Sequence, residues 1–224
     1  MTRESQPIIV RQLGTVEYTR SWEQMKSFNS ERDSATADEI WLLQHPPVFT
    51  QGLKYRPEHE PVDYKTIPVV HSDRGGDITY HGPGQLVAYL LIDMKRKNMG
   101  IKTLVTAIEE SIMNLLEDHN ISGKRKSGAP GIYVTEKKIA SLGLRVRQGA
   151  SYHGLSLNVD MDLKPFSAIP PCGFRSLEMT QIADFYPNPQ INDIGSRLVA
   201  HLGRNLGYNK IEFEQGGLFE QSPR

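Results

Sequence analysis

Cys172 is the only cysteine of the chain, and it stands between Pro171 and Gly173. A thiolate is the strongest side-chain nucleophile available near neutral pH, so a cysteine in a loop can attack an acyl group and hold it as a thioester. A lone cysteine is more often a small, buried and unreactive side chain. Burial is less favourable in a segment of prolines and glycines, so we treat Cys172 as a candidate nucleophile.

A glycine-rich stretch is the second feature that could take part in chemistry. Residues 74–85 (Arg-Gly-Gly-Asp-Ile-Thr-Tyr-His-Gly-Pro-Gly-Gln) contain four glycines and one proline and run directly into the apolar residues 86–92. Because glycine has no Cβ, backbone amides in such a stretch can approach a ligand closely. A glycine-rich wall together with an isolated thiol suggests acyl chemistry.

A thiol needs a neighbouring cation to ionise at neutral pH. A free cysteine has a pKa of about 8.5, and a nearby ammonium or imidazolium lowers it by one to several units. The residues alone leave four candidates for this role: Lys137, Lys138, His81 and His153.

Motifs for other kinds of site are absent from the sequence. There is no Walker phosphate loop, complete G-x-G-x-x-G, H-E-x-x-H or C-x-x-C pair, and the seven histidines show no ligand spacing. We therefore expect neither a metal site nor a bound cofactor.

Composition limits the function classes further. The 224 residues carry 26 basic and 26 acidic side chains, a balance that argues against a general nucleic-acid-binding protein. No apolar run is long enough for a membrane span, and no signal core follows the N-terminus, so we expect a cytoplasmic protein. Two basic clusters, residues 95–97 and 124–126, are candidates for steering an acidic partner.

The order of elements predicts an α+β (mixed α/β) fold in one domain, residues 1–224, with a loose tail from about residue 216. Helices are predicted from apolar spacing of three and four residues, strands from apolar runs, and one hairpin from a polar turn. The predicted helices cover residues 18–28, 103–119 and 191–206. The predicted strands cover residues 7–14, 40–44, 85–93, 131–134, 138–146 and 153–160. Of these, residues 85–93 should form a central strand buried on both faces.

Four ordered motifs together resemble the octanoyltransferase family, whose members are also called lipoyl(octanoyl) transferases. They are residues 74–85, residues 131–133 with 138–143 (Lys-Ile-Ala-Ser-Leu-Gly), residues 153–159 (His-Gly-Leu-Ser-Leu-Asn-Val) and residues 171–173. The resemblance implies the α/β catalytic domain shared by biotin and lipoate protein ligases, a mixed sheet flanked by helices.

The resemblance also implies a reaction. An octanoyl group passes from the phosphopantetheine arm of octanoyl-acyl carrier protein to a lysine of a lipoyl domain, as in 2-oxoacid dehydrogenases or the glycine cleavage H protein. Cys172 is then the nucleophile that forms the acyl thioester. Lys138 lowers the pKa of Cys172 and later accepts a proton. No cofactor is implied, and we expect a monomer.

The substrate-binding residues implied by the resemblance fall in three segments of the motifs. They are Arg74, Gly75, Gly76, Asp77, Ile78, Thr79, Tyr80, His81, Ser141, Leu142, Gly143, Gly154, Leu155 and Ser156. Four of them, Gly75, Gly76, Gly143 and Gly154, leave room for the octanoyl chain beside the backbone, with Tyr80 and Leu142 as apolar walls.

Three alternatives remain. An ATP-dependent lipoate or biotin ligase would need no nucleophilic cysteine. A cysteine-dependent octanoyl amidotransferase would move the group between two carrier domains. A catalytically silent module that binds carrier proteins would keep Cys172 buried and unreactive.

Overall fold

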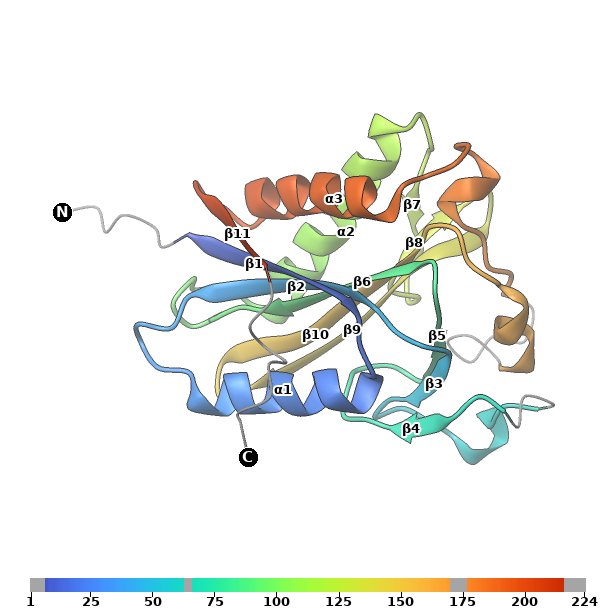
Figure 1. Cartoon of the computed structure of the whole chain (residues 1–224), viewed down its shortest axis with the longest axis horizontal. Coiled ribbons are helices and arrows are strands. Elements are labelled where there is room, and N and C mark those ends of the chain that lie inside the picture. Colours follow the sequence, from blue (N-terminus) through green and yellow to red (C-terminus); the bar gives the residue numbers. More distant parts are fainter. Residues whose placement is uncertain (1–6, 63–65, 170–176, 216–224) are drawn as a thin grey trace.

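The computed structural model describes residues 7–62, 66–169 and 177–215 (Figure 1). Their main feature is an eight-stranded mixed sheet with the strand order β11-β1-β2-β6-β10-β9-β8-β7. β1 runs parallel to both of its neighbours, β2 and β11, whereas the remaining pairs are antiparallel. The strands are β1 (Ile8–Thr15), β2 (Asp38–Gln44), β6 (Gln85–Leu91), β7 (Lys124–Arg125), β8 (Ile132–Val134), β9 (Lys137–Arg147), β10 (Ala150–Asn158) and β11 (Ile211–Gln215).

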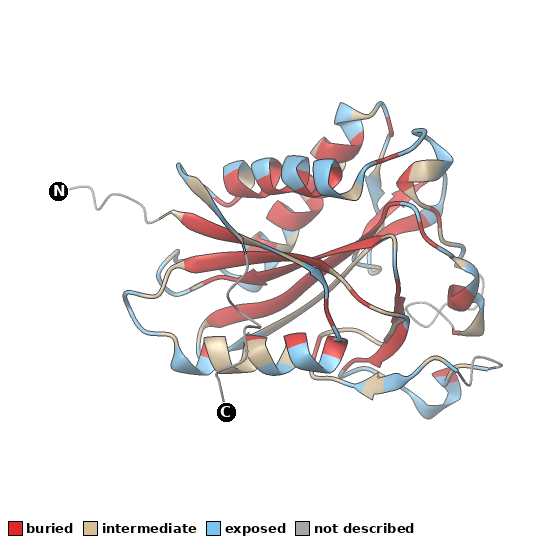
Figure 2. Ribbon diagram, viewed as in Figure 1, coloured by how far each residue is buried: buried red, intermediate tan, exposed pale blue. Residues whose placement is uncertain are grey.

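Three α-helices cover the two faces of this sheet. α2 (Ile101–Asp118) and α3 (Ile191–Asn205) lie on one face and α1 (Tyr18–Glu31) on the other (Figure 1). α2 forms because its apolar residues recur every three or four positions and so make one stripe that packs on the sheet. Figure 2 shows the result, with buried strands between helices whose outer faces are exposed.

β6 is the centre of the sheet, as its apolar sequence predicts. All seven of its residues are buried, because helices cover both faces and β2 and β10 cover both edges. Leu86, Ala88 and Leu90 point to the side of α2 and α3, and Val87, Tyr89 and Leu91 to the side of α1. This alternation places Val87 and Tyr89 on the face that carries the site described below.

A smaller sheet of three strands, in the order β4-β3-β5, lies beside the main one. It contains β3 (Val48–Gln51), β4 (Val69–His71) and β5 (Ile78–His81). Three short 3-10 helices complete the described elements, at Pro57–His59, Lys164–Ala168 and Ile182–Asp184. The small sheet packs through Phe49 and Tyr80 onto Phe166, and thereby supports the glycine-rich stretch.

The α+β class is confirmed, and each predicted helix and strand is present within a few residues of its predicted ends. The hairpin of β8 and β9 turns at Thr135 and Glu136, both with positive φ, as tight hairpin turns require. The small sheet, β7 and β11 were not predicted, because their strands are only two to five residues long. The predicted tail lies outside the described residues, and the single-domain organisation stays a prediction.

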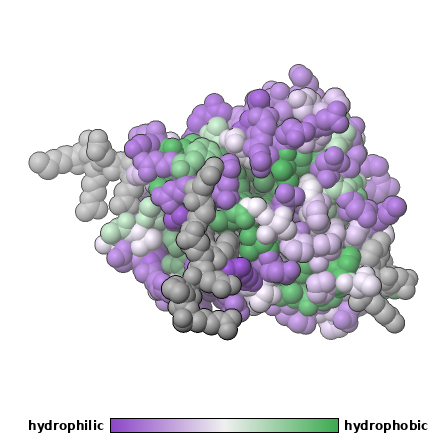
Figure 3. All heavy atoms as spheres, viewed as in Figure 1, coloured by the Kyte–Doolittle hydropathy of each residue, from purple (hydrophilic) through white to green (hydrophobic). Residues whose placement is uncertain are grey.

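Polar side chains cover most of the face seen in Figure 3, and the apolar groups there lie in small separate patches. Within the described ranges, no helix combines the length and apolarity that crossing a membrane requires.

Candidate active site

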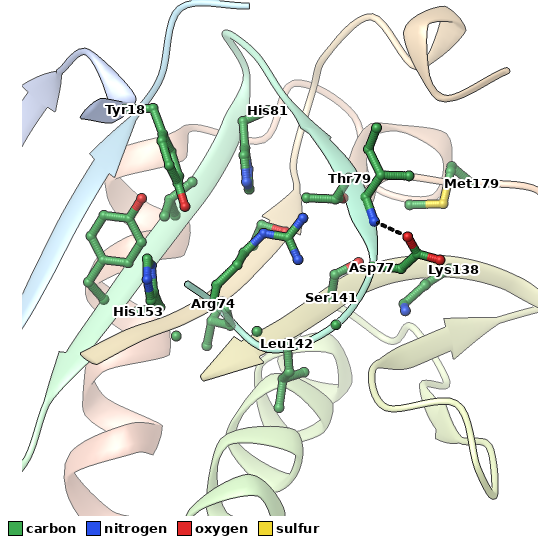
Figure 4. A pocket seen from close by; sticks show the side chains of 18 residues that line it. Tyr18, Arg74, Asp77, Thr79, His81, Lys138, Ser141, Leu142, His153 and Met179 are labelled. Atoms are coloured by element: carbon green, nitrogen blue, oxygen red, sulfur yellow. Dashed lines mark hydrogen bonds between the residues drawn. The ribbon is translucent and has the colours of Figure 1, made fainter. Parts of the chain in front are cut away.

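A pocket lies between the α1 face of the main sheet and the glycine-rich stretch (Figure 4). Its empty space, the open mouth included, is about 620 Å³. Among the described residues it is lined by Tyr18, Arg74, Gly76, Asp77, Ile78, Thr79, His81, Val87, Tyr89, Lys138, Ser141, Leu142, Gly143, His153, Gly154, Leu155, Ser156 and Met179.

The base of the pocket is made by small residues in register on neighbouring strands. Ser156 of β10 pairs with Ser141 of β9, and Gly154 pairs with Gly143. Because residues two apart on a strand point to the same face, these positions form two successive rows above which little side-chain volume stands. The sheet therefore provides a slot that runs along the strands.

The glycine-rich stretch crosses directly over β9. The Gly75 amide donates to the Leu144 carbonyl at 3.1 Å. A Cβ on Gly75 would lie 2.9 Å from that carbonyl oxygen, and a Cβ on Gly143 would lie 3.1 Å from the Gly75 oxygen. Such contacts leave no room for side chains, so glycine at both positions is what lets the loop close over the slot.

Arg74 ties this loop to the small sheet. Its Nε donates to Thr50 Oγ1 at 2.8 Å, one terminal nitrogen donates to the Gly75 carbonyl at 3.0 Å, and the other donates to the Thr50 carbonyl. The guanidinium is thus engaged by the protein itself while its side chain lines the pocket. We infer a structural role for Arg74 in shaping the pocket wall.

Lys138 lies at one end of the slot and is only 1% exposed. Its Nζ is 5.7 Å from the centroid of the Tyr133 ring. Gly131, with φ +132°, lies against its stem, where a Cβ would come within 2.5 Å of Lys138 Cε. Lys137, by contrast, is exposed on the strand edge and pairs with Glu178 at 2.7 Å. Of the two neighbouring lysines, Lys138 is therefore the one that reaches the pocket.

Residues 178 and 180 are hydrogen-bonded to the backbone of Lys138. The Lys138 amide donates to the Glu178 carbonyl at 2.9 Å, and the Thr180 amide donates to the Lys138 carbonyl at 3.0 Å. Met179, between them, lines the pocket. Cys172 lies outside the described residues, so its predicted role as nucleophile is not tested by the geometry.

A chain of buried amides connects β5 with Thr180. His81 Nδ1 donates to Gln85 Oε1 at 2.7 Å, Gln85 Nε2 donates to Asn158 Oδ1 at 2.9 Å, and Asn158 Nδ2 donates to the Thr180 carbonyl at 2.9 Å. Burial lowers the pKa of His81 well below its ordinary value, so the ring is neutral at neutral pH. The other ring nitrogen, Nε2, lies 3.4 Å from Thr50 Oγ1. A neutral His81 with both ring nitrogens engaged suits a structural role in the wall better than acid–base chemistry.

The structure brings nearly all of the predicted substrate-binding residues to this one pocket. Gly75 and Tyr80 are the exceptions. Gly75 faces β9, and Tyr80 points to the opposite side of β5 from Thr79 and His81, where it packs on Phe49 and Phe166. Strand alternation is the reason, so Tyr80 is not the apolar wall that the sequence suggested.

Four lining residues were not predicted, namely Tyr18, Val87, Tyr89 and Met179. In the sequence, Tyr18 belongs to the apolar spacing of a helix with one buried face. Val87 and Tyr89 belong to the apolar run of a core strand. These patterns report burial but not the cavity that the buried side chain faces.

The two basic clusters are partly neutralised by neighbours within the chain. Arg96 pairs with Asp38 at 2.7 Å, and Arg125 pairs with Glu109 at 3.0 Å. Lys126 Nζ donates to the Glu136 carbonyl at 3.1 Å and forms an ion pair with the Glu136 carboxylate at 2.6 Å. These contacts give the clusters a structural role, and partner steering by them stays a prediction.

Comparison with known proteins shows which family has this arrangement. Residues 17–203 match the model of the lipoyl protein ligase A/B catalytic domain. A protein of Legionella pneumophila (strain Paris) named octanoyltransferase is 53% identical over 194 residues, which are 87% of this chain and 97% of the relative. The chain belongs to the octanoyltransferase family. An octanoyltransferase of Marinobacter nauticus is 51% identical over 93% of this chain and 98% of its own length.

The family resemblance seen in the motifs is thereby confirmed, as is the expectation of an acyltransferase active in octanoyl transfer for protein lipoylation. Solved structures confirm the fold. A lipoate-protein ligase A bound with ATP superposes with a TM-score of 0.78 at 18% identity, covering 96% of this chain and 90% of that one. A biotin protein ligase from Aquifex aeolicus gives a TM-score of 0.52 at 11% identity, covering 89% and 69%.

Proposed function

We propose that this acyltransferase moves an octanoyl group from octanoyl-acyl carrier protein to a lysine of a lipoyl domain, through a thioester on Cys172. The observation that carries the proposal is the position of Lys138. It is a buried lysine at one end of a slot floored by small residues, with its backbone hydrogen-bonded to the segment that follows Cys172 in sequence. No cofactor takes part in the proposed reaction.

In the first half-reaction, the Cys172 thiolate attacks the carbonyl carbon of the octanoyl thioester. A bond forms between Cys172 Sγ and the acyl carbon, the bond from that carbon to the pantetheine sulfur breaks, and the leaving thiolate takes a proton from the Lys138 ammonium. One thioester replaces another, so no nucleotide hydrolysis is needed. A cation beside Cys172 also favours the thiolate before the attack.

In the second half-reaction, the amine of the target lysine attacks the same carbonyl carbon. An amide bond forms, the bond to Cys172 Sγ breaks to return the thiolate, and Lys138, now neutral, accepts the proton that the amine loses. A lysine suits both steps because its pKa responds readily to burial and to neighbouring charge.

Relatives support lipoyl domains as the acceptor class. One solved neighbour is described as a bipartite lipoate protein ligase and its E2 lipoyl domain from Thermoplasma acidophilum, with a TM-score of 0.77 at 18% identity. That likeness concerns the fold. The relatives that are 53% and 51% identical to this chain are named octanoyltransferase. Their name favours acyl transfer over the ATP-dependent ligase reaction.

The test is intact-mass measurement after brief incubation with octanoyl-acyl carrier protein without ATP. An added octanoyl group on the wild type that is absent from Cys172→Ser and discharged by a lipoyl domain is the expected result. If modification of the lipoyl domain instead requires ATP and free octanoate and survives Cys172→Ser, the protein is a ligase. If an octanoylated carrier domain also serves as donor, the amidotransferase reaction is favoured.

A further inference from the structure

The ring of His153 lies on an unexpected face of β10. Its centroid is 5.1 Å from that of the preceding Tyr152, with the planes 28° apart, although successive residues of a strand normally point to opposite faces. The cause is the backbone of His153, which has φ +56°. A residue other than glycine in this left-handed region is uncommon, and such outliers concentrate at functional sites. Here the outlier turns an imidazole toward the pocket.

Asp73 holds the ring in this position. His153 Nε2 donates to Asp73 Oδ1 at 3.0 Å, and the same carboxylate accepts hydrogen bonds from Trp22 Nε1 at 2.7 Å and from the Tyr152 hydroxyl. Burial alone would raise the pKa of Asp73, but these donors together bring it well below its ordinary value. Burial lowers the pKa of His153, so a neutral ring donates to a charged carboxylate.

His153 lies at the end of the slot that is remote from Lys138. Among the described residues of β10 it is the last that lines the pocket toward the Ala150 end of the strand, and Gly143 is the last on β9. Gly143 is five positions beyond Lys138 on β9 (143 − 138), roughly 16 Å at about 3.3 Å per residue. The slot thus has a definite length between the lysine and the imidazole.

Tyr18 and Tyr89 complete the wall at this end, and Figure 4 shows Tyr18 on the same side of the pocket as His153. The centroid of the His153 ring lies 6.0 Å from that of Tyr89 and 6.5 Å from that of Tyr18. The tyrosine hydroxyls are engaged, Tyr18 with Ser72 and Tyr89 with His45. The tyrosines are therefore fixed by the fold, whereas His153 contributes its ring through a local backbone distortion.

We propose that His153 closes the far end of the acyl slot and sets the longest chain that the enzyme accepts, which makes it a specificity-determining residue. This inference rests on the proposed octanoyl transfer. A longer chain would press its terminal carbons against the imidazole, and its carbonyl carbon would then lie out of reach of the group that attacks it. A chain short enough to end before the imidazole avoids this conflict.

The test removes the imidazole by a substitution to glycine, which suits the positive φ at this position. His153→Gly relieves the left-handed backbone and opens the end of the slot, and His153→Asn is a second variant, because asparagine tolerates this conformation and is smaller than histidine. Gln148→Gly is the matched control, since Gln148 also has a positive φ, of 55°, but lies exposed in the turn between β9 and β10. Two readouts are compared for chains of six, eight, ten and twelve carbons: calorimetric affinity for the free fatty acids, and acyl-enzyme formation from the acyl-carrier proteins.

The wild type and Gln148→Gly should disfavour ten carbons against eight by at least about tenfold, the effect typical of one or two misplaced methylenes. In His153→Gly this ratio should fall at least tenfold or reverse, with a smaller change in the same direction in His153→Asn. Folded variants with an unchanged chain-length order would overturn the inference, as would a wild type without affinity for any of these chains. His153→Gly could change the chain-length preference in fatty-acid binding while no variant, nor the wild type, forms an acyl-enzyme. That result would support the role of His153 and contradict the proposed function.

Discussion

Gly131 lies against the stem of Lys138, so that a Cβ atom at Gly131 would stand 2.5 Å from Lys138 Cε and 3.2 Å from Nζ. The glycine also has φ +132°, a conformation that residues with side chains rarely adopt. The position of Lys138 in the pocket thus depends on the absence of a side chain at Gly131, the residue directly before β8.

Gly131→Ala should displace Lys138 and lower the rate of acyl-enzyme formation. It should also lower stability, because the Cβ would lie 2.4 Å from the Ala140 carbonyl oxygen. Gly128→Ala is the control, because Gly128 also has a positive φ, +75°, but has no atom within 4 Å of a built Cβ. Rapid-quench intact mass gives the rate, and thermal unfolding gives the stability. Equal acylation rates in the two variants would show that the contact with Lys138 has no catalytic consequence.

Lys138→Met should slow both half-reactions by about 10²- to 10⁴-fold, the usual contribution of a positioned proton-transfer group. The pKa of the Cys172 thiol should rise toward the ordinary value of about 8.5 once the ammonium is gone. Because the chain has one cysteine, the pH dependence of alkylation reports this thiol without ambiguity. Lys137→Met, which removes the exposed ion pair with Glu178, should leave both quantities close to those of the wild type.

Gly143→Val should push the glycine-rich stretch away from β9 and obstruct the slot, because the contacts there leave no room for a side chain. A Cβ at Gly143 already lies 3.1 Å from the Gly75 carbonyl oxygen and 3.3 Å from Arg74 Cδ, so the methyl groups of valine must occupy the space above the strand. We expect at least a tenfold weaker affinity for octanoate, measured by calorimetry. Gly100→Ala, at a glycine with no atom within 4 Å of a built Cβ, serves as the control. Undiminished affinity in Gly143→Val would place the acyl chain elsewhere.

Stability should fall as the pH drops from 6.5 toward 4, because His45 is buried as a neutral ring. Burial lowers its pKa from 6.5 to about 4, while Nδ1 donates to the Val16 carbonyl at 2.6 Å and Nε2 accepts from the Tyr89 hydroxyl at 2.7 Å. In this window the unfolded chain binds a proton that the folded protein does not. Stability is therefore complete above pH 6.5, and a loss of the order of 3 kcal/mol accumulates down to pH 4.

Urea unfolding at pH 7 and pH 5 measures this effect. His45→Gln should show a smaller loss between the two pH values than the wild type, and His71→Gln, an exposed position on β4, should show the same loss as the wild type. The same slope in His45→Gln as in the wild type would assign the pH dependence to other groups.

Local patterns in the sequence were enough to predict the elements that carry the site. The apolar run of β6 and the three- and four-residue spacing of α2 specify elements whose burial depends mainly on their own residues. The polar turn at Thr135 and Glu136 likewise specifies the hairpin that carries Lys138. The motifs around Arg74, Lys138 and His153 are sufficient by themselves to indicate the family.

Tertiary structure alone decided which side chains share the pocket. Tyr18 is part of an ordinary buried helix stripe, and only the packing of α1 on the sheet brings it to the cavity. Tyr80 was expected in the wall but points away, because the pairing of β5 with β3 fixes its face. His153 lies on the pocket side through a single backbone dihedral that strand periodicity cannot express. Periodicity records whether a residue is buried, whereas the direction of a side chain depends on dihedrals and on partners far away in the sequence.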